Sequence, residues 1–329
     1  MLHLRVISPP RRTTEVLRAL SDTTGVTNLI VLSGAARVPA GDLILFDVAR
    51  EAANGAIFCL KLHGIDAEGS IAIEHVDLSL SEVAERAERE SPGEGDDAVV
   101  WDELAVRVGD DSKMTWAFLA FLVIATQLTA IGVVIPSIIL IVGAMVLGPE
   151  FGAVTAICFG LMAWQWRLIL VAARSLIVGF AIAIVVTTCC ALVARGLGWL
   201  DLTTLTGHPE VEFIVKPDKW SIIVAVLAGA AGVLSITSGK PSALVGVFIS
   251  VTTVPAAGYL AVALTLGRWG DVGGSAAQLG INIAGMVISG TVTLAVQRLL
   301  WSRLGTPVHD LRRTFNSSLR PTTAGRFPR

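Results

Sequence analysis

The pattern of apolar positions changes abruptly near residue 113. Before that point charged and apolar residues are interleaved, whereas from Trp116 to Trp301 the chain is mostly apolar. A helix needs about 20 consecutive apolar residues to cross a bilayer. We predict six membrane spans, over residues 114–134, 137–163, 168–194, 220–238, 242–266 and 276–300. The fold class is therefore an α-helical polytopic membrane domain, 114–304, that follows a polar N-terminal domain.

The N-terminal domain, 1–80, alternates between strand-like and helix-like patterns. Strand patterns occupy 2–8, 26–33, 42–48 and 69–76, and helix patterns occupy 13–20 and 50–62. The order β-α-β-β-α-β predicts a ferredoxin-like α+β domain. Small sensory domains often have this fold, but a fold alone does not assign a function.

A predicted helical and acidic linker, 81–113, joins the two domains. A charged helix over 81–90 precedes a stretch rich in Pro, Gly and acids over 91–97. A short amphipathic stretch follows over 99–108, and the polar run 110–112 is predicted to cap the first span.

Composition supports the membrane assignment. Of the 329 residues 53% are hydrophobic and only 16% are charged, below the roughly 25% charged residues of soluble domains. The mean hydropathy is +0.70. The net charge of −2 and the lack of a basic patch predict no nucleic-acid partner. The expected partner is the lipid bilayer, in the bacterial inner membrane.

Topology follows from charge and span number. Residues 1–5 lack a basic segment followed by an apolar one, so we expect no signal peptide and a cytoplasmic N-terminus. The tail, 305–329, is rich in Arg and is expected to be disordered and cytoplasmic. Six spans place both termini on one side. The outside loop, 195–219, carries Lys216 and Lys219, which is mild evidence against this orientation.

Two of the predicted spans share an interruption. Pro136-Ser137 opens one span, which Gly148-Pro149-Glu150 interrupts, and Pro241-Ser242 opens the other, which the run 252–255 (Thr-Thr-Val-Pro) interrupts. Proline cannot donate a helix hydrogen bond and clashes with the preceding turn. In lipid the freed backbone groups need partners in protein or in a water-filled cavity. A matched pair of broken helices is the sequence pattern of a transporter binding site.

The two halves of the membrane domain align through their Pro-Ser dipeptides. Each half has three predicted spans, and an odd number means that the second half inserts upside down relative to the first. The sequence thus predicts a 3+3 inverted repeat. The alternative is a pair of unrelated kinked helices.

Glu150 is the only acid between Thr115 and Asp201. A carboxylate near the membrane centre costs about 2.5–3.5 kcal/mol. Its position after Pro149, in the first turn of a half-helix, lowers that cost because free N–H groups and the helix dipole favour negative charge. We predict that Glu150 binds a cation, carries a proton or shares the helix end with a substrate. The alternative is a helix cap with no further role.

The matching break carries hydroxyl groups and no acid. Thr252 and Thr253 are predicted to line a site, although back-bonding within their own helix explains them equally well. Polar residues of neighbouring spans would complete the site, and interhelical hydrogen bonding is the alternative for each. They are Gln127, Thr129, Ser235, Thr237, Ser238, Gln278 and Asn282. The predicted substrate- or ion-binding residues are Gly148, Pro149, Glu150, Gly152, Thr252, Thr253, Pro255, Gln127, Ser235 and Asn282.

The sequence shows no pattern typical of an enzyme. It has no Gly-rich phosphate loop and no Ser, His and Asp set in reach of one another, and its four cysteines and five histidines have no metal-ligand spacing. We therefore expect no enzymatic activity, no cofactor and no metal site.

The run Ser-Ile-Ile-Leu-Ile-Val-Gly-Ala-Met-Val-Leu-Gly-Pro-Glu-Phe-Gly over 137–152 resembles the Gly-Ala-Met…Gly-Pro signature of a bacterial family. That family is catalogued as domain of unknown function 389, the "uncharacterised hydrophobic domain" proteins. The segments 238–246 and 254–258, with Asn282, fit its second half. The run 254–256 (Val-Pro-Ala) replaces the Pro-Pro pair expected of the family. The resemblance implies an integral membrane protein and assigns no function.

These observations favour a transporter or channel for an ion or small solute, with its site at the two broken helices near the membrane midplane. The N-terminal domain would regulate it or mediate assembly into a homo-oligomer. The alternative is a non-transporting, membrane-anchored sensor or scaffold that acts through its N-terminal domain. A solvated cavity shared by both breaks favours the first function, and a closed bundle favours the second.

Overall fold

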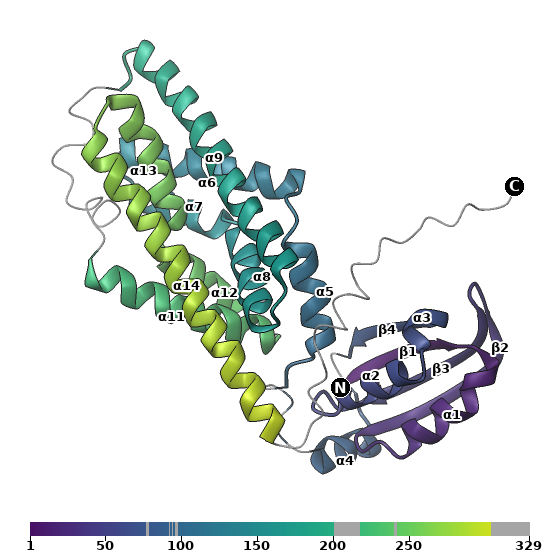
Figure 1. Cartoon of the computed structure of the whole chain (residues 1–329). Coiled ribbons are helices and arrows are strands. Elements are labelled where there is room, and N and C mark those ends of the chain that lie inside the picture. Colours follow the sequence, from purple (N-terminus) through teal and green to yellow (C-terminus); the bar gives the residue numbers. More distant parts are fainter. Residues whose placement is uncertain are drawn as a thin grey trace, which may run out of the picture. The chain divides into compact units, whose positions relative to one another are not determined.

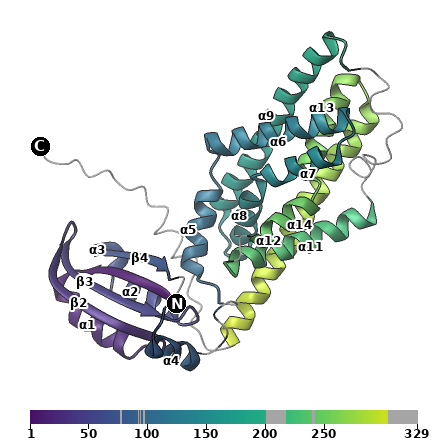
Figure 2. The same ribbon diagram turned by 180° about the vertical axis from the view of Figure 1, so that it is seen from behind.

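The chain forms two compact units in the computed structural model (Figures 1 and 2). One contains Met1–Leu104 and the chain from Val296 onward, and the other is Ala105–Ala295. The structure describes residues 1–76, 79–91, 93, 95, 98–200, 218–239 and 242–303. Outside these residues lie part of the predicted linker over 91–97, most of the predicted loop 195–219, Pro241 of the second Pro-Ser pair, and the predicted tail 305–329.

A small antiparallel sheet forms the centre of the N-terminal unit. The strands are β1 (Leu2–Ser8), β2 (Val26–Arg37), β3 (Ala40–Val48) and β4 (Ser70–His75), in the spatial order β2-β3-β1-β4. Alternation along β1 buries Leu2, Leu4 and Val6 completely on one face. The helices α1 (Pro10–Ser21) and α2 (Ala53–Leu62) cover that face, as Figure 1 shows.

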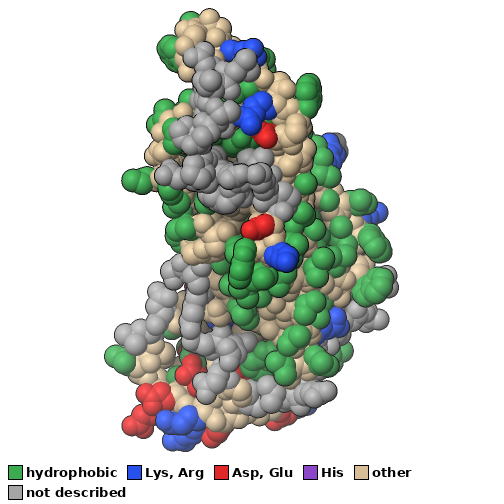
Figure 3. All heavy atoms as spheres, turned by 90° about the vertical axis from the view of Figure 1, so that its left-hand side faces the viewer, with side chains coloured by type: hydrophobic (Ala, Val, Ile, Leu, Met, Phe, Trp, Pro, Cys, Tyr) green, Lys and Arg blue, Asp and Glu red, His purple; other side chains and the backbone are tan. Residues whose placement is uncertain are grey.

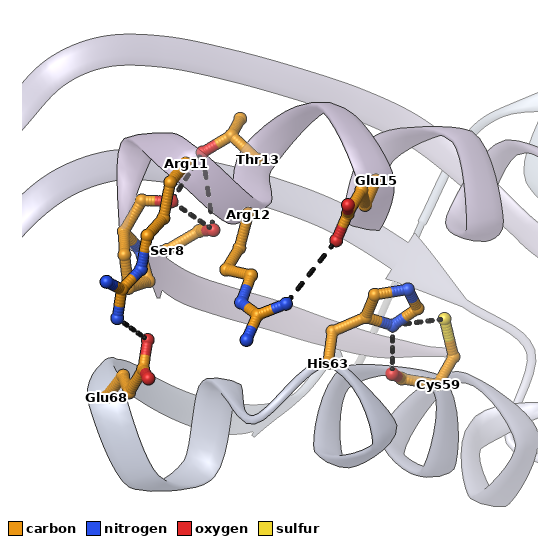
Figure 4. A network of polar contacts seen from close by, with 9 residues as sticks. Ser8, Arg11, Arg12, Thr13, Glu15, Cys59, His63 and Glu68 are labelled. Carbon is orange, nitrogen blue, oxygen red and sulfur yellow. Dashed lines mark hydrogen bonds and ion pairs between the residues drawn. The ribbon is translucent and has the colours of Figure 1, made fainter.

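The predicted strands and helices of this unit occur in the predicted order, with small shifts. Helix α1 begins at Pro10 rather than residue 13, because proline is well suited to the first helical position. The sequence prediction missed α3 (Ile65–Glu68), a single turn before β4. Figure 4 shows the contact that ties α1 to α3, in which Arg11 Nη2 donates to Glu68 Oε2 at 2.7 Å. This bond lowers the pKa of Glu68.

The predicted linker contains two helices, α4 (Glu82–Glu90) and α5 (Trp101–Asp111). The prediction that the run 110–112 caps the first span is wrong. Asp110 and Asp111 complete α5, because the amphipathic stretch continues as one helix through them. The first span is capped instead by Thr115, whose Oγ1 accepts a hydrogen bond from the Phe118 N–H at 3.1 Å.

Apolar helices make up the second unit, and the last of them continues past Ala295. Within the part of the chain that the structure describes, five helical segments are long and apolar enough to cross a membrane, and a sixth results if one bent helix pair counts as a single span. The five are α6 (Trp116–Val134), α9 (Trp166–Gly196), α11 (Lys219–Thr237), the segment Leu244–Leu266 and the Trp269–Trp301 part of α14 (Trp269–Arg303). The bent pair is α7 (Ile138–Leu147) and α8 (Glu150–Met162), at an angle of 49°. This confirms a helical protein of the membrane class.

Both predicted interruptions occur as helix breaks. The first separates α7 from α8, and the second separates α12 (Ser242–Ser250) from α13 (Thr253–Leu266). Helix α14 begins at Trp269 rather than residue 276. Its first turn is polar, and it contains Asp271, whose negative charge is favoured there by the helix dipole.

Polar and small residues fix how these helices pack. Ser175 Oγ of α9 donates to the carbonyl of Ser112, just before α6, at 2.8 Å. Farther along both helices Gln127 Nε2 donates to Cys190 Sγ at 3.7 Å, so α6 and α9 run parallel. Helix α14 crosses α11 where Gly229 lies against the Met286 backbone.

The outward faces of the long helices remain apolar. Leu170 and Ile177 of α9 are 67% and 71% exposed, and Leu227 of α11 is 63% exposed. Figure 3 shows hydrophobic side chains spread over one side of the molecule. Apolar surface on this scale is typical of helices that face lipid.

Candidate functional site

The two helix breaks are in direct contact. Thr253, the first residue of α13, donates a hydrogen bond from Oγ1 to Oε1 of Glu150, the first residue of α8, at 2.5 Å. These residues are 103 positions apart in the chain. The sequence predicted both breaks, and the structure joins them at their first helical residues.

Local chemistry explains why each half-helix begins where it does. Pro149 precedes α8, and Pro255 lies in the first turn of α13, where the missing N–H costs no helix hydrogen bond. The first turn of α8 presents free N–H groups and the positive end of the helix dipole to the Glu150 carboxyl. A carboxyl is therefore tolerated in an otherwise apolar helix.

Helix α14 contributes two amides to the same place. Gln278 Nε2 and Asn282 Nδ2 both donate to Thr252 Oγ1, at 3.2 Å and 2.9 Å. Residues four apart lie on one face of a helix, so α14 presents both amides together. Because Thr252 adjoins Thr253, the polar contacts extend from α14 through the start of α13 to α8.

The cluster is buried, and two of its oxygens lack partners. Glu150 is 6% exposed, and Thr253 and Gln278 are each 1% exposed. Among the described residues, no group donates to Glu150 Oε2 or Gln278 Oε1. A buried polar atom without a partner costs about 1–3 kcal/mol, so the contacts within the protein leave this cluster incomplete.

Two glycines allow close approach to α8. A Cβ at Gly148 would overlap Glu150 Oε2 and would lie 2.9 Å from a methyl group of Val254. A Cβ at Gly152 would lie 3.0 Å from the Cβ of Asp111. The first glycine makes room for the carboxyl group. The second brings Asp111, which the sequence analysis assigned only to the cap of the first span, beside the first turn of α8.

A first cavity, of about 400 Å³, reaches the residues around Glu150. It is lined by residues at the start of α6, including Thr115 and Phe118, and by Pro149, Phe151 and Gly152 at the first break. It therefore lies at the N-terminal end of α6. Phe151 packs edge-on against Phe248 of α12, with ring centroids 6.0 Å apart.

A second cavity, of about 280 Å³, reaches the other break. It is lined by Thr252 and Asn282, by Ile138 and Met145 of α7, and by Asp218 before α11. Its lining runs along α7 from Ile138, which follows the C-terminal end of α6. That end of α6 is about 28 Å from the N-terminal end. The two cavities therefore approach the breaks from different ends of α6, and neither is lined by Glu150 or Thr253.

Asp218 is an acidic residue in the lining of the second cavity. Its carboxylate accepts hydrogen bonds from the Ser221 N–H and hydroxyl at 2.8 Å and 2.9 Å, which cap α11. These bonds lower the pKa of Asp218, so this group stays ionised at neutral pH.

The structure brings together Gly148, Glu150, Thr252, Thr253 and Asn282 of the predicted residues. Gln127 is half-buried and hydrogen-bonds to Cys190 of α9, away from this cluster. Ser235 is buried within α11. Gln278 was named with Asn282 as a polar residue that could complete the site but was left out of the predicted binding set, and the structure places it in the cluster.

Residues 145–288 match the model of a family described as Domain of unknown function (DUF389). This part of the chain is similar to the DUF389 family. The DUF389 match runs from the end of α7 into α14, so it includes both breaks and both amides that reach Thr252. It confirms the resemblance predicted from the sequence.

The chain is also similar to an archaeal protein. "Uncharacterized protein MJ0678" of Methanocaldococcus jannaschii is 23% identical over 178 residues, which cover 54% of this chain and 52% of that protein. The chain therefore spans about half the length of this relative. No solved structure matches the chain.

Proposed function

We propose that this protein is a transporter or channel for an ion or small solute, and that its site is the junction of the two broken helices. The observation that carries the proposal is the hydrogen bond from Thr253 to Glu150. A structural cap would need only its own helix. A bond between two interrupted helices, with amides from a third, is the arrangement expected of a binding site inside a membrane domain.

The proposal includes the 3+3 inverted repeat. Each half would contain one broken span between two intact ones: α7 and α8 between α6 and α9, and α12 and α13 between α11 and α14. In such a repeat the first spans of the two halves begin on opposite sides of the membrane. The cavity at the start of α6 and the cavity beside Asp218 would then open to opposite sides.

The Glu150–Thr253 contact would be the barrier between these cavities. One cavity is lined by the neighbours of Glu150 and the other by the neighbour of Thr253. Separating the two side chains would join the cavities or expose the site to one side at a time. Binding of the transported species would provide the energy for that change.

We further propose a ferredoxin-like fold for the N-terminal domain and a cytoplasmic position for both termini in the inner membrane. Support for the fold comes from the order β2-β3-β1-β4, in which β3 lies antiparallel between β1 and β2. The domain would regulate transport or mediate homo-oligomer formation.

Flux in reconstituted vesicles tests the proposed function. Purified full-length protein in proteoliposomes is assayed with Na⁺, K⁺, H⁺, Cl⁻ and small neutral solutes, beside protein-free liposomes. We expect wild-type flux of at least one of these and its loss in Glu150→Gln, with equal insertion of both proteins. Flux that is unchanged in Glu150→Gln would contradict a role for the junction, and no flux of any tested species would contradict transport of these classes.

A sensor function is the second candidate, because the N-terminal unit contains its own polar cavity of about 590 Å³. Its lining includes Arg50, His75, Glu88 and Arg89. A panel of amino acids and nucleotides in a thermal-shift assay on the full chain tests it. A ligand-dependent shift that Arg89→Ala removes, together with no flux, would favour this function over transport.

A further inference from the structure

The two unpartnered oxygens at the junction require a common explanation. Glu150 Oε2 and Gln278 Oε1 are both buried, and each belongs to a group whose other polar atom is hydrogen-bonded within the cluster. Both atoms are acceptors when the carboxyl group is ionised. A proton on Glu150 would account for only the first oxygen. A cation that both oxygens help to coordinate would account for both.

Charge at the junction points to a single positive charge. Among the described residues no Lys, Arg or His forms an ion pair with Glu150. The other acid in the later spans, Asp271, is paired with Arg268 Nε at 2.7 Å. One ionised carboxylate in a low-dielectric interior is neutralised by one monovalent cation, whereas a divalent ion would leave an excess charge.

The surrounding ligands suit a hard cation. Carboxylate, hydroxyl and amide oxygens are the groups that hard cations prefer, and the described residues hold no cluster of three His, Cys, Asp or Glu side chains for a transition metal. The Thr253 hydroxyl supplies a further oxygen, because it donates its proton to Glu150 and keeps its lone pairs free. Thr252 holds Gln278 in place by accepting a hydrogen bond from its amide nitrogen. The carbonyl ends of interrupted helices, such as α7 at Leu147, are known to coordinate Na⁺ in broken-helix transporters.

We propose that the junction binds one alkali metal cation, such as Na⁺, through Glu150 Oε2, the hydroxyl oxygen of Thr253 and Gln278 Oε1. This inference rests on the proposed function and specifies the ion that the site would bind. Charged groups on the adjoining elements are Arg107, Asp110 and Asp111 of α5 and Lys113 after it. They line the first cavity, where Asp111 would attract the cation toward α8.

Thermal stability of the full chain in detergent tests the proposal without any need for transport. Melting temperatures are compared in NaCl, KCl, MgCl₂ and N-methyl-D-glucamine chloride at equal ionic strength and pH 8. We expect NaCl or KCl to raise the melting temperature in a saturable way, because a ligand of the native state stabilises it. The shift should vanish in Glu150→Gln.

Two further variants keep the test decisive if Glu150→Gln does not fold. Gln278→Leu and Thr253→Val should each weaken cation affinity by about tenfold, the effect of losing one oxygen ligand or charge-assisted hydrogen bond. Thr155→Val is the matched control, because its buried hydroxyl donates to the Phe151 carbonyl of its own helix and should leave the shift intact. Equal melting in all salts, a shift only with MgCl₂, or a shift that Gln278→Leu and Thr253→Val retain would overturn the proposal.

Failure of this inference is distinct from failure of the proposed function. Cation binding in detergent without flux in liposomes supports the site and contradicts transport. Flux without any effect of alkali cations on the melting temperature contradicts the cation site. The proposed transport function would then stand, with another species as the one carried.

Discussion

At the scale of single residues, the sequence was most informative where it departed from an ordinary membrane helix. Glu150, Thr252 and Thr253 each lie within three residues of a proline in an apolar segment. All three take part in the junction. Gln127 is the opposite case. Its polarity was equally visible, but a single sequence does not say which neighbour a helix face meets, and this side chain turns to Cys190.

Gly148 offers a residue-scale test of the space around the carboxyl. Its backbone angles, φ −64° and ψ 120°, suit any residue, so Gly148→Ala adds only a Cβ that overlaps Glu150 Oε2. Displacing the carboxyl costs about 1–3 kcal/mol, and we expect transport or cation affinity to fall by about tenfold. Gly143→Ala in α7 is the control, because nothing lies within 4 Å of its Cβ position. Equal behaviour of the two variants would contradict the need for space beside the carboxyl.

At the scale of elements, apolar run length predicted the helices well and their ends less well. The stretch 168–194 is the core of α9, and 220–238 is nearly the whole of α11. Polar ends misled the prediction: the acids at 110–111 belong to α5, and α14 begins with a polar turn. Pairing of the two breaks was not predictable in atomic terms, because it depends on how distant helices pack.

The crossing of α11 and α14 provides an element-scale test. A Cβ at Gly229 would lie 2.6 Å from the carbonyl oxygen of Met286, so the two backbones approach closely. We expect Gly229→Val to force the helices apart and to destabilise the protein by about 1–3 kcal/mol. Unfolding in mixed micelles with increasing SDS measures this. Gly280→Ala, with open space around its Cβ position, should be neutral; similar losses in both variants would count against the close crossing.

At the scale of the whole molecule, the proposed transport depends on two cavities that open to opposite sides of the membrane. Lys113 lines the first cavity and Lys219 begins α11, next to Asp218 of the second; both lysines are exposed. Sequence charge suggested the orientation, but no membrane boundary follows from the sequence or from the packing of the helices alone.

Cysteine labelling tests this arrangement. Lys113→Cys and Lys219→Cys are made separately in a chain whose four native cysteines are replaced. A membrane-impermeant maleimide added to right-side-out vesicles should label only Lys219→Cys, and labelling of Lys113→Cys should require opened vesicles. Labelling of both positions from one side would exclude the inverted repeat.

Whether the two broken helices form one site is tested most directly by a double-mutant cycle on flux between Glu150→Asp and Thr253→Val. Flux of the species that the wild type carries is measured in proteoliposomes for both single variants and the double variant. Glu150→Asp keeps the charge but shortens the side chain by one methylene, and Thr253→Val removes the donor, so both changes remove the same hydrogen bond. We therefore expect the double variant to lose little more than the more impaired single variant. Losses that multiply, as for independent positions, would contradict a single shared site.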